Sequence, residues 1–187
     1  MVAQRQLHTI EEFEAFISQP EQADRLFEYI GGEIVEKMPS STYVSEIAMR
    51  IAFWIMHFLQ QHGMDGHVTG EAGTYNVSGE RYAPDVAFKR KPTTQEYPDP
   101  NPPELAVEVV SRSDQRADRE ERLQVKIGNY LAAETLLWVV RPEEQTVYIY
   151  APGQPVRILT IEDELDGGDV LPGFRLAVRA IFPEIEL

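Results

Sequence analysis

The 187-residue sequence has no cysteine, few histidines and no long apolar segment. Disulfides and cysteine-ligated zinc are therefore excluded, and the composition suits a reducing cytoplasm. The 4 histidines lack the spacing of zinc ligands. The most apolar run, Ile47–Leu59, contains Arg50 and is too short to span a bilayer, so we expect a core helix and no membrane contact. Residues 1–9 lack the apolar core of a secretory signal.

Basic residues are also scarce, because 17 Lys and Arg face 31 Asp and Glu, for a formal charge of −14. Such a charge disfavours nonspecific binding to nucleic acid. The stretch 81–126 nevertheless holds 9 basic and 9 acidic residues, so the rest of the chain, with 17 − 9 = 8 basic and 31 − 9 = 22 acidic residues, carries the whole excess. Two basic clusters lie in this neutral stretch: Lys89, Arg90 and Lys91, and Arg112, Arg116, Arg119 and Arg122. Each cluster is either a set of phosphate contacts or a solvated surface.

The length and a hydrophobic content of 43% predict one domain over residues 1–187. Its expected parts are an N-terminal helix and hairpin at about 9–38, a core at about 43–141 and C-terminal strands at about 145–187. Core helices are expected at 43–61 and 116–133, strands at 67–77, 83–88, 104–111, 135–140, 146–150, 156–161 and 175–178, a loop at 91–103, and a solvated acidic turn at 162–169. This order indicates an α/β (α+β) fold with a mixed central sheet flanked by helices.

Two of the expected strands each carry one acid among apolar residues. Side chains alternate along a strand, so Asp85 shares a face with Ala87, and Glu108 shares a face with Ala106 and Val110. A buried carboxylate is costly unless it is paired or binds a metal. Two of them on neighbouring strands therefore indicate a cation between them.

The helix that follows brings a lysine towards these acids. Leu123, Ile127 and Tyr130 have the spacing of a core-facing stripe, and Lys126 lies at its edge. Two acids and a lysine are the minimum set for metal-assisted phosphodiester cleavage. The acids bind a hard divalent cation such as Mg²⁺, and the lysine stabilises the developing anion or orients the attacking water.

Five parts of the chain follow one another in a distinctive order: 27–35, 84–88, 107–111, Lys126 with Tyr130, and 137–142. In these parts the sequence resembles the Uma-two-type restriction endonucleases of the PD-(D/E)XK nuclease superfamily. The resemblance implies a restriction-endonuclease-like core and an Mg²⁺- or Mn²⁺-dependent endonuclease that hydrolyses DNA. It also implies that Asp85 and Glu108 are metal ligands, helped by the Val109 carbonyl, and that Lys126 is the catalytic lysine.

The sequence departs from the superfamily pattern at two places. The lysine normally lies two residues after the second acid, where this chain has Val110, so Lys126 of the next helix is expected to replace it. A histidine that many family members carry near Val44 is also missing. Two alternatives stay open: a catalytically inactive nuclease fold that serves in binding or assembly, and a nuclease that acts on RNA.

Other acids and a tyrosine are secondary candidates for the site. Any of Glu28, Glu33, Glu46 and Glu71 would extend the metal shell if the fold brought it near Asp85. Tyr130 is expected to be a core tyrosine rather than a phosphate contact. Endonucleases that cut both strands often pair, which leaves a homodimer open.

Overall fold

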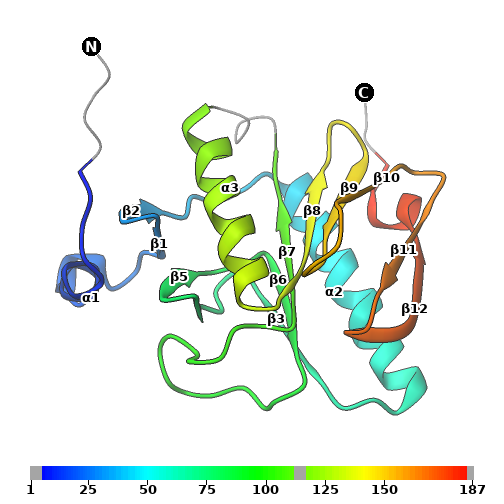
Figure 1. Ribbon diagram of the computed structural model, residues 1–187, viewed down its shortest axis with the longest axis horizontal. Helices are drawn as coiled ribbons and strands as arrows, with labels where there is room; N and C mark the ends of the chain where they lie inside the picture. Colours follow the sequence, from blue (N-terminus) through cyan, green and yellow to red (C-terminus); the bar gives the residue numbers. More distant parts are fainter. Residues whose placement is uncertain (1–5, 112–116, 185–187) are drawn as a thin grey trace.

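The computed structural model describes residues 6–111 and 117–184, and its centre is a six-stranded sheet (Figure 1). The strands are β3 (His67–Gly70), β6 (Val86–Lys89), β7 (Leu105–Val109), β8 (Leu136–Arg141), β9 (Thr146–Tyr150) and β10 (Arg157–Leu159). Their order is β10-β9-β8-β7-β6-β3, with β7 and β8 parallel and the other neighbours antiparallel. The predicted mixed central sheet flanked by helices is confirmed.

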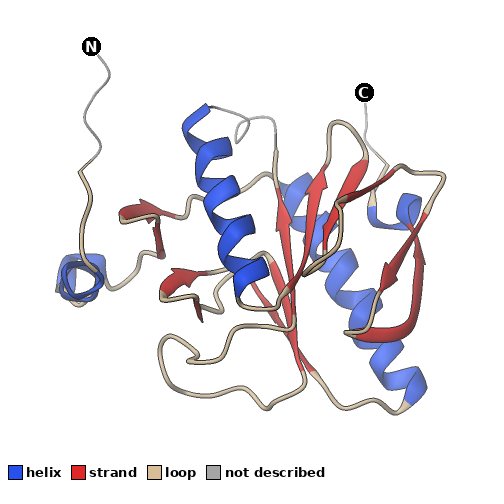
Figure 2. Cartoon of the chain, viewed as in Figure 1, coloured by secondary structure: helices blue, strands red, loops and turns tan. Residues whose placement is uncertain are grey.

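Two long helices cover opposite faces of this sheet (Figure 2). Helix α2 (Thr42–His62) begins where the Ser41 hydroxyl accepts a hydrogen bond from the Val44 N–H, and it ends at Gly63 in the left-handed conformation. It packs on the bulky side chains of β6 and β7. Helix α3 (Ala117–Ala132) packs on the other face, where these two strands present smaller residues. The small residues leave room for polar side chains beneath α3.

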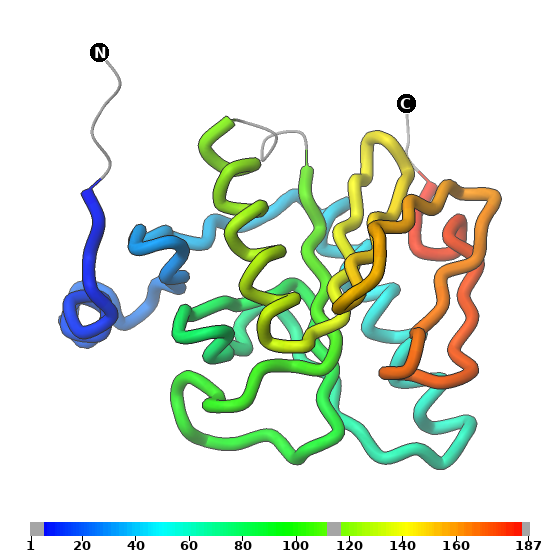
Figure 3. The backbone as a smooth tube through the Cα atoms, in the orientation of Figure 1, coloured from blue at the N-terminus to red at the C-terminus, as the bar shows by residue number. Residues whose placement is uncertain are grey.

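The N-terminal part forms a second, smaller sheet beside α3. Helix α1 (Ile10–Ile17) starts with a capping box, and a 3₁₀ turn, η1 (Pro20–Gln22), follows it. Strands β1 (Phe27–Ile30) and β2 (Glu33–Glu36) form the hairpin expected within 9–38, and its turn residues Gly31 and Gly32 both have positive φ. Strands β4 (Tyr75–Val77) and β5 (Glu80–Tyr82) complete the order β2-β1-β5-β4, so residues far apart in sequence lie side by side (Figure 3).

Two local predictions are wrong. The single strand expected over 67–77 is two strands in different sheets, because the chain turns after Gly70, where the Gly73 N–H bonds to the Gly70 carbonyl. The expected acidic turn at 162–169 contains β11 (Glu164–Gly167), which pairs with β12 (Leu171–Ala177) before the 3₁₀ helix η3 (Val178–Ile181). The fully buried Leu165 and Leu171 anchor this hairpin in the core on the α2 side.

The longest helix, α2, has 21 residues and carries the apolar run 47–59. Within the described residues, no helix is both long enough and apolar enough to cross a membrane. The expected loop at 91–103 connects β6 to β7 and contains no named strand or helix.

Candidate active site

Asp85 is fixed at the start of β6 by two hydrogen bonds to β7. Its backbone N–H donates to the Val107 carbonyl at 3.0 Å, and its Oδ2 accepts from the Val109 N–H at 2.7 Å. The second bond holds the carboxylate next to the residue that follows Glu108. The register of two antiparallel strands, which pairs Val86 with Val107, thus brings the two acids together.

Both acids lie on the α3 side of the sheet. Ala87, Ala106 and Val110 belong to the apolar cluster under α3, whereas the intervening residues of each strand pack against α2. The face predicted for Asp85 and Glu108 from side-chain alternation therefore agrees with the structure. Glu108 is buried, with 8% of its surface exposed.

Lys126 reaches down from α3 between two glutamates. Its Nζ lies 2.6 Å from Glu108 Oε1 and 3.0 Å from Glu28 Oε1, and it sits 5.2 Å from the centre of the Tyr82 ring. The sequence placed Lys126 at the edge of the helix stripe, but the residue is only 5% exposed. Two carboxylates and an aromatic face make such burial of an ammonium tolerable.

Glu28 and Tyr130 complete the buried part of the cluster. Glu28, on β1, also accepts a hydrogen bond from the Ala83 N–H at 2.8 Å. Tyr130 is fully buried and donates its hydroxyl to Glu108 Oε1 at 3.0 Å, in line with the expected core tyrosine. Of the four secondary acids, the structure thus brings Glu28 directly onto Lys126.

Lys37 is a member of the cluster that the sequence did not reveal. It follows β2, and its Nζ donates to Asp85 Oδ1 at 2.9 Å and to the Ala83 carbonyl. Its own strand pattern carries no signal for this role, because the contact depends on how the hairpin docks beside β6. A lysine directly after a strand that ends in polar residues is otherwise typical of a solvated turn.

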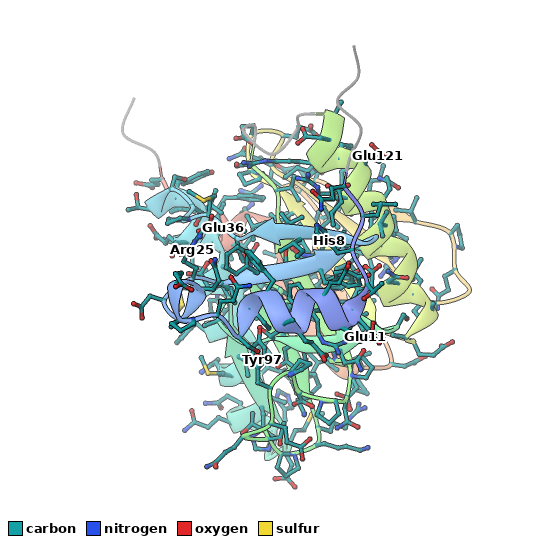
Figure 4. All side chains as sticks on the ribbon, turned by 90° about the vertical axis from the view of Figure 1, so that its left-hand side faces the viewer. His8, Glu11, Arg25, Glu36, Tyr97 and Glu121 are labelled. Carbon is teal, nitrogen blue, oxygen red and sulfur yellow. The ribbon has the colours of Figure 1, made fainter. Side chains whose placement is uncertain are left out.

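The three acids and two lysines of the cluster line one pocket of about 360 Å³ between the hairpin, the ends of β6 and β7, and α3. Arg119 and Arg122 of α3 also line it, as do Met38 and Pro39. The hairpin wall is braced at its base, where Arg25 and Glu36 form an ion pair and lie against each other (Figure 4). Acidic and basic side chains therefore lie together around a cavity with an open side.

The charges in the cluster shift one another's titration. Burial raises the pKa of Glu108, against the pull of Lys126, and the neighbouring Glu28 and Asp85 raise it further. Burial also opposes ionisation of Glu28, but Lys126, Lys37 and the Ala83 N–H together hold its pKa below the usual range. Burial lowers the pKa of Lys126, but Glu108 and Glu28 outweigh this effect and raise it. Burial also lowers the pKa of Lys37, but Asp85 and Glu108 outweigh this effect, so its pKa is raised too.

The remaining acid candidates lie away from these contacts. Glu33 accepts hydrogen bonds from the Arg122 guanidinium at 2.7 and 3.1 Å. Glu46 pairs with Arg50 on the exposed side of α2, and Glu71 is exposed in the turn after β3.

The two predicted basic clusters differ in where their residues lie and in what they contact. Lys89 is 2% exposed and pairs with Asp99, and Arg90 bonds to the Val170 carbonyl, so these two residues are structural, whereas Lys91 is exposed. In the second cluster Arg119 and Arg122 line the pocket, while Arg112 and Arg116 lie outside the described residues.

The oxygen donors of the pocket suit an ion such as Mg²⁺, which does not need a full cage of side-chain ligands. Within residues 6–111 and 117–184, no three His, Cys, Asp or Glu side chains group as a metal cage. Mg²⁺ typically keeps several waters and takes only one or two carboxylates. The Val109 carbonyl would add a third oxygen. The N–H and carbonyl of a strand residue point to the same side of the strand, and the Val109 N–H faces Asp85. Asp85, Glu108 and Val109 thus fit such an ion.

Comparisons with known proteins give a family match and a structural likeness. The family model Uma2, described as “Putative restriction endonuclease”, matches residues 10–179. A crystal structure from Anabaena variabilis, described as a “putative nuclease belonging to DUF820”, has a TM-score of 0.75 and 20% sequence identity, and the match covers 90% of this chain and 96% of that one. None of the curated proteins compared with the chain matches it. At this identity the structural likeness concerns the fold alone.

Proposed function

Since the chain belongs to the Uma2 family, we propose that it is an endonuclease that hydrolyses DNA phosphodiester bonds with the help of a divalent metal. The observation that carries the proposal is the meeting of two acids from neighbouring strands with a helix lysine in one pocket. Asp85, Glu108 and Lys126 are the residues that we assign to the reaction. Their roles were predicted from the sequence and stay predictions.

Asp85, Glu108 and the Val109 carbonyl would hold Mg²⁺ or Mn²⁺. When bound, the ion lowers the pKa of a coordinated water and neutralises charge on the scissile phosphate. The Val109 N–H fixes one oxygen of Asp85, and the Tyr130 hydroxyl fixes one oxygen of Glu108, so both ligands are oriented before the ion arrives.

Lys126 would supply positive charge at the reacting phosphate. Its raised pKa keeps it an ammonium at neutral pH, which excludes a role as general base there and favours stabilisation of the developing anion. Glu28 positions Lys126 through an ion pair from strand β1. Arg119 and Arg122 would contact flanking phosphates at the open side of the pocket.

Endonucleases that cut both strands of a duplex often pair, so we further expect a homodimer that acts on DNA in the cytoplasm. Size-exclusion chromatography with light scattering tests the dimer. A purely monomeric protein would contradict this expectation.

The proposal is tested by nicking of a supercoiled plasmid with Mg²⁺ or Mn²⁺. We expect Asp85→Ala and Lys126→Ala to lower the rate by at least about 100-fold, the scale on which single electrostatic groups act. Glu46→Gln, which changes an acid on the exposed side of α2, is the matched control and should cleave like the wild type. Equal cleavage by all four proteins would remove the assignment, and faster cleavage of an RNA substrate would reassign the substrate.

An inactive binding or assembly module is the second candidate, because ion pairs already occupy Asp85, Glu108 and Glu28. That candidate predicts no nicking with any divalent metal and no calorimetric binding of Mg²⁺ or Mn²⁺. Binding of either ion that is lost in Asp85→Ala favours the enzyme.

A further inference from the structure

The two lysines of the cluster differ in how they are held. Lys126 is enclosed between Glu28 and Glu108, and 7% of its side chain is exposed. Lys37 forms its ion pair with Asp85, and both side chains of that pair are 16% exposed. Lys37 therefore lies nearer to solvent than Lys126 does, on a flexible stem of four methylene groups.

Lys37 occupies the oxygen of Asp85 that the Val109 N–H leaves available. Asp85 Oδ2 is bound by the Val109 N–H at 2.7 Å, and Oδ1 is bound by the Lys37 ammonium at 2.9 Å. The ammonium also donates a hydrogen bond to the Ala83 carbonyl, so two oxygens fix its position. A divalent ion that approaches Asp85 meets a monovalent cation already in place.

We propose that Lys37 is a tethered counter-ion of Asp85 that a divalent metal must displace, so that Lys37 weakens the metal affinity of the site. The inference rests on the proposed function, since it concerns the ion that the proposed reaction uses. In the metal-free protein Lys37 compensates the charge of Asp85, which otherwise adds to the negative charge of Glu108 and Glu28. When the metal binds, the Lys37 ammonium leaves Asp85 and moves towards the open side of the pocket.

The expected effect follows from charge repulsion and from competition for one oxygen. A dication and an ammonium within about 5 Å of each other repel strongly even at the effective dielectric of a partly exposed site. Removing the ammonium also leaves Asp85 without its counter-ion in the metal-free protein, which makes metal binding more favourable. Both effects tighten metal binding, and together they should exceed about tenfold.

Calorimetric titration with MnCl₂ and with MgCl₂ tests the proposal without relying on activity. Lys37→Met should bind Mn²⁺ at least about tenfold more tightly than the wild type. Lys37→Gln, which keeps a hydrogen-bond donor for Asp85 without the charge, should also bind more tightly and serves if Lys37→Met does not fold. Lys37→Arg keeps the charge and should bind as weakly as the wild type. Lys91→Met, which removes an exposed lysine after β6, is the matched control and should change nothing.

The outcomes separate this inference from the proposed function. Equal or weaker Mn²⁺ binding by both Lys37→Met and Lys37→Gln overturns the inference. If binding is lost in Asp85→Ala under the same conditions, that result leaves the proposed function standing. Failure of the wild type and of every Lys37 variant to bind either ion overturns both.

Discussion

At the scale of single residues, the candidate site is a balance of buried charges. Three carboxyl groups and two ammonium groups share it, and each ammonium is held by a different set of oxygens. Removing one partner of a buried pair leaves the other without compensation, which costs more than the pair contributes. Stability at this site therefore depends on which groups are ionised.

Glu28→Gln should make this dependence visible. The pKa of Glu28 is held below its usual range, so its ionised form stabilises the fold above the unfolded pKa near 4.3, and that stability is lost as pH falls through the folded pKa. We expect the variant to lose about 3 kcal/mol of unfolding free energy at pH 7 and less at pH 3. Urea unfolding at both pH values measures the difference.

The control for Glu28→Gln is Glu46→Gln, which removes an exposed acid and should shift stability little at either pH. An equal loss at pH 7 and pH 3 for Glu28→Gln would show that the ionised form of Glu28 does not carry the effect.

Local rules found part of the site and missed the rest. Asp85 and Glu108 were predictable to share a face because alternation along a strand is a local property. Lys37 was not, because only the docking of the hairpin beside β6 brings it to Asp85. The burial of Lys126 was missed for the same reason, since Glu28 lies 98 residues away in the sequence.

At the scale of elements, strong start and stop signals were reliable. The ends of α2 follow from Ser41 and Gly63, and the hairpin follows from Gly31 and Gly32. The stretch 67–77 failed because its two halves are equally suited to strands, and nothing local shows that they join different sheets. The choice between sheets is made by the partner strands β5 and β6, whose pairing a local pattern does not reveal.

Two glycine substitutions should separate helix propensity from turn geometry. Gly128 is exposed within α3, and a methyl group added there would meet no atom within 4 Å, so Gly128→Ala should raise the unfolding free energy by about 0.5–1 kcal/mol. Gly32 has φ of +85°, so Gly32→Ala should lower it by about 1 kcal/mol. Thermal unfolding followed by circular dichroism measures both. Stabilisation by Gly32→Ala would show that the turn does not need its positive φ.

At the scale of the whole molecule, the charge distribution would limit binding of DNA, the substrate that we propose. The chain carries a net charge of −14, so its overall field repels a polyanion. Of the described cations that line the pocket, Lys37 and Lys126 are engaged with the cluster acids, and Arg122 pairs with Glu33 and Asp118. Arg119 and Arg122 are the two that we propose for phosphate contacts. DNA affinity should therefore be modest and should depend on few phosphate contacts.

The salt dependence of DNA binding tests this view. Each phosphate contact contributes a slope of roughly −0.9 to log K against log salt concentration, so two arginines predict a slope of about −2. Arg122→Ala should reduce the slope by about one unit, and it also removes the Arg122 guanidinium from Glu33. Arg157→Ala is the control. It removes an exposed arginine of the edge strand β10, which pairs with Asp166, and it should leave the slope unchanged. Fluorescence anisotropy with a short labelled duplex in EDTA, which prevents cleavage, gives the slopes. A slope that Arg122→Ala does not alter would place the DNA on another surface, because the contact that the pocket offers would then carry no part of the binding.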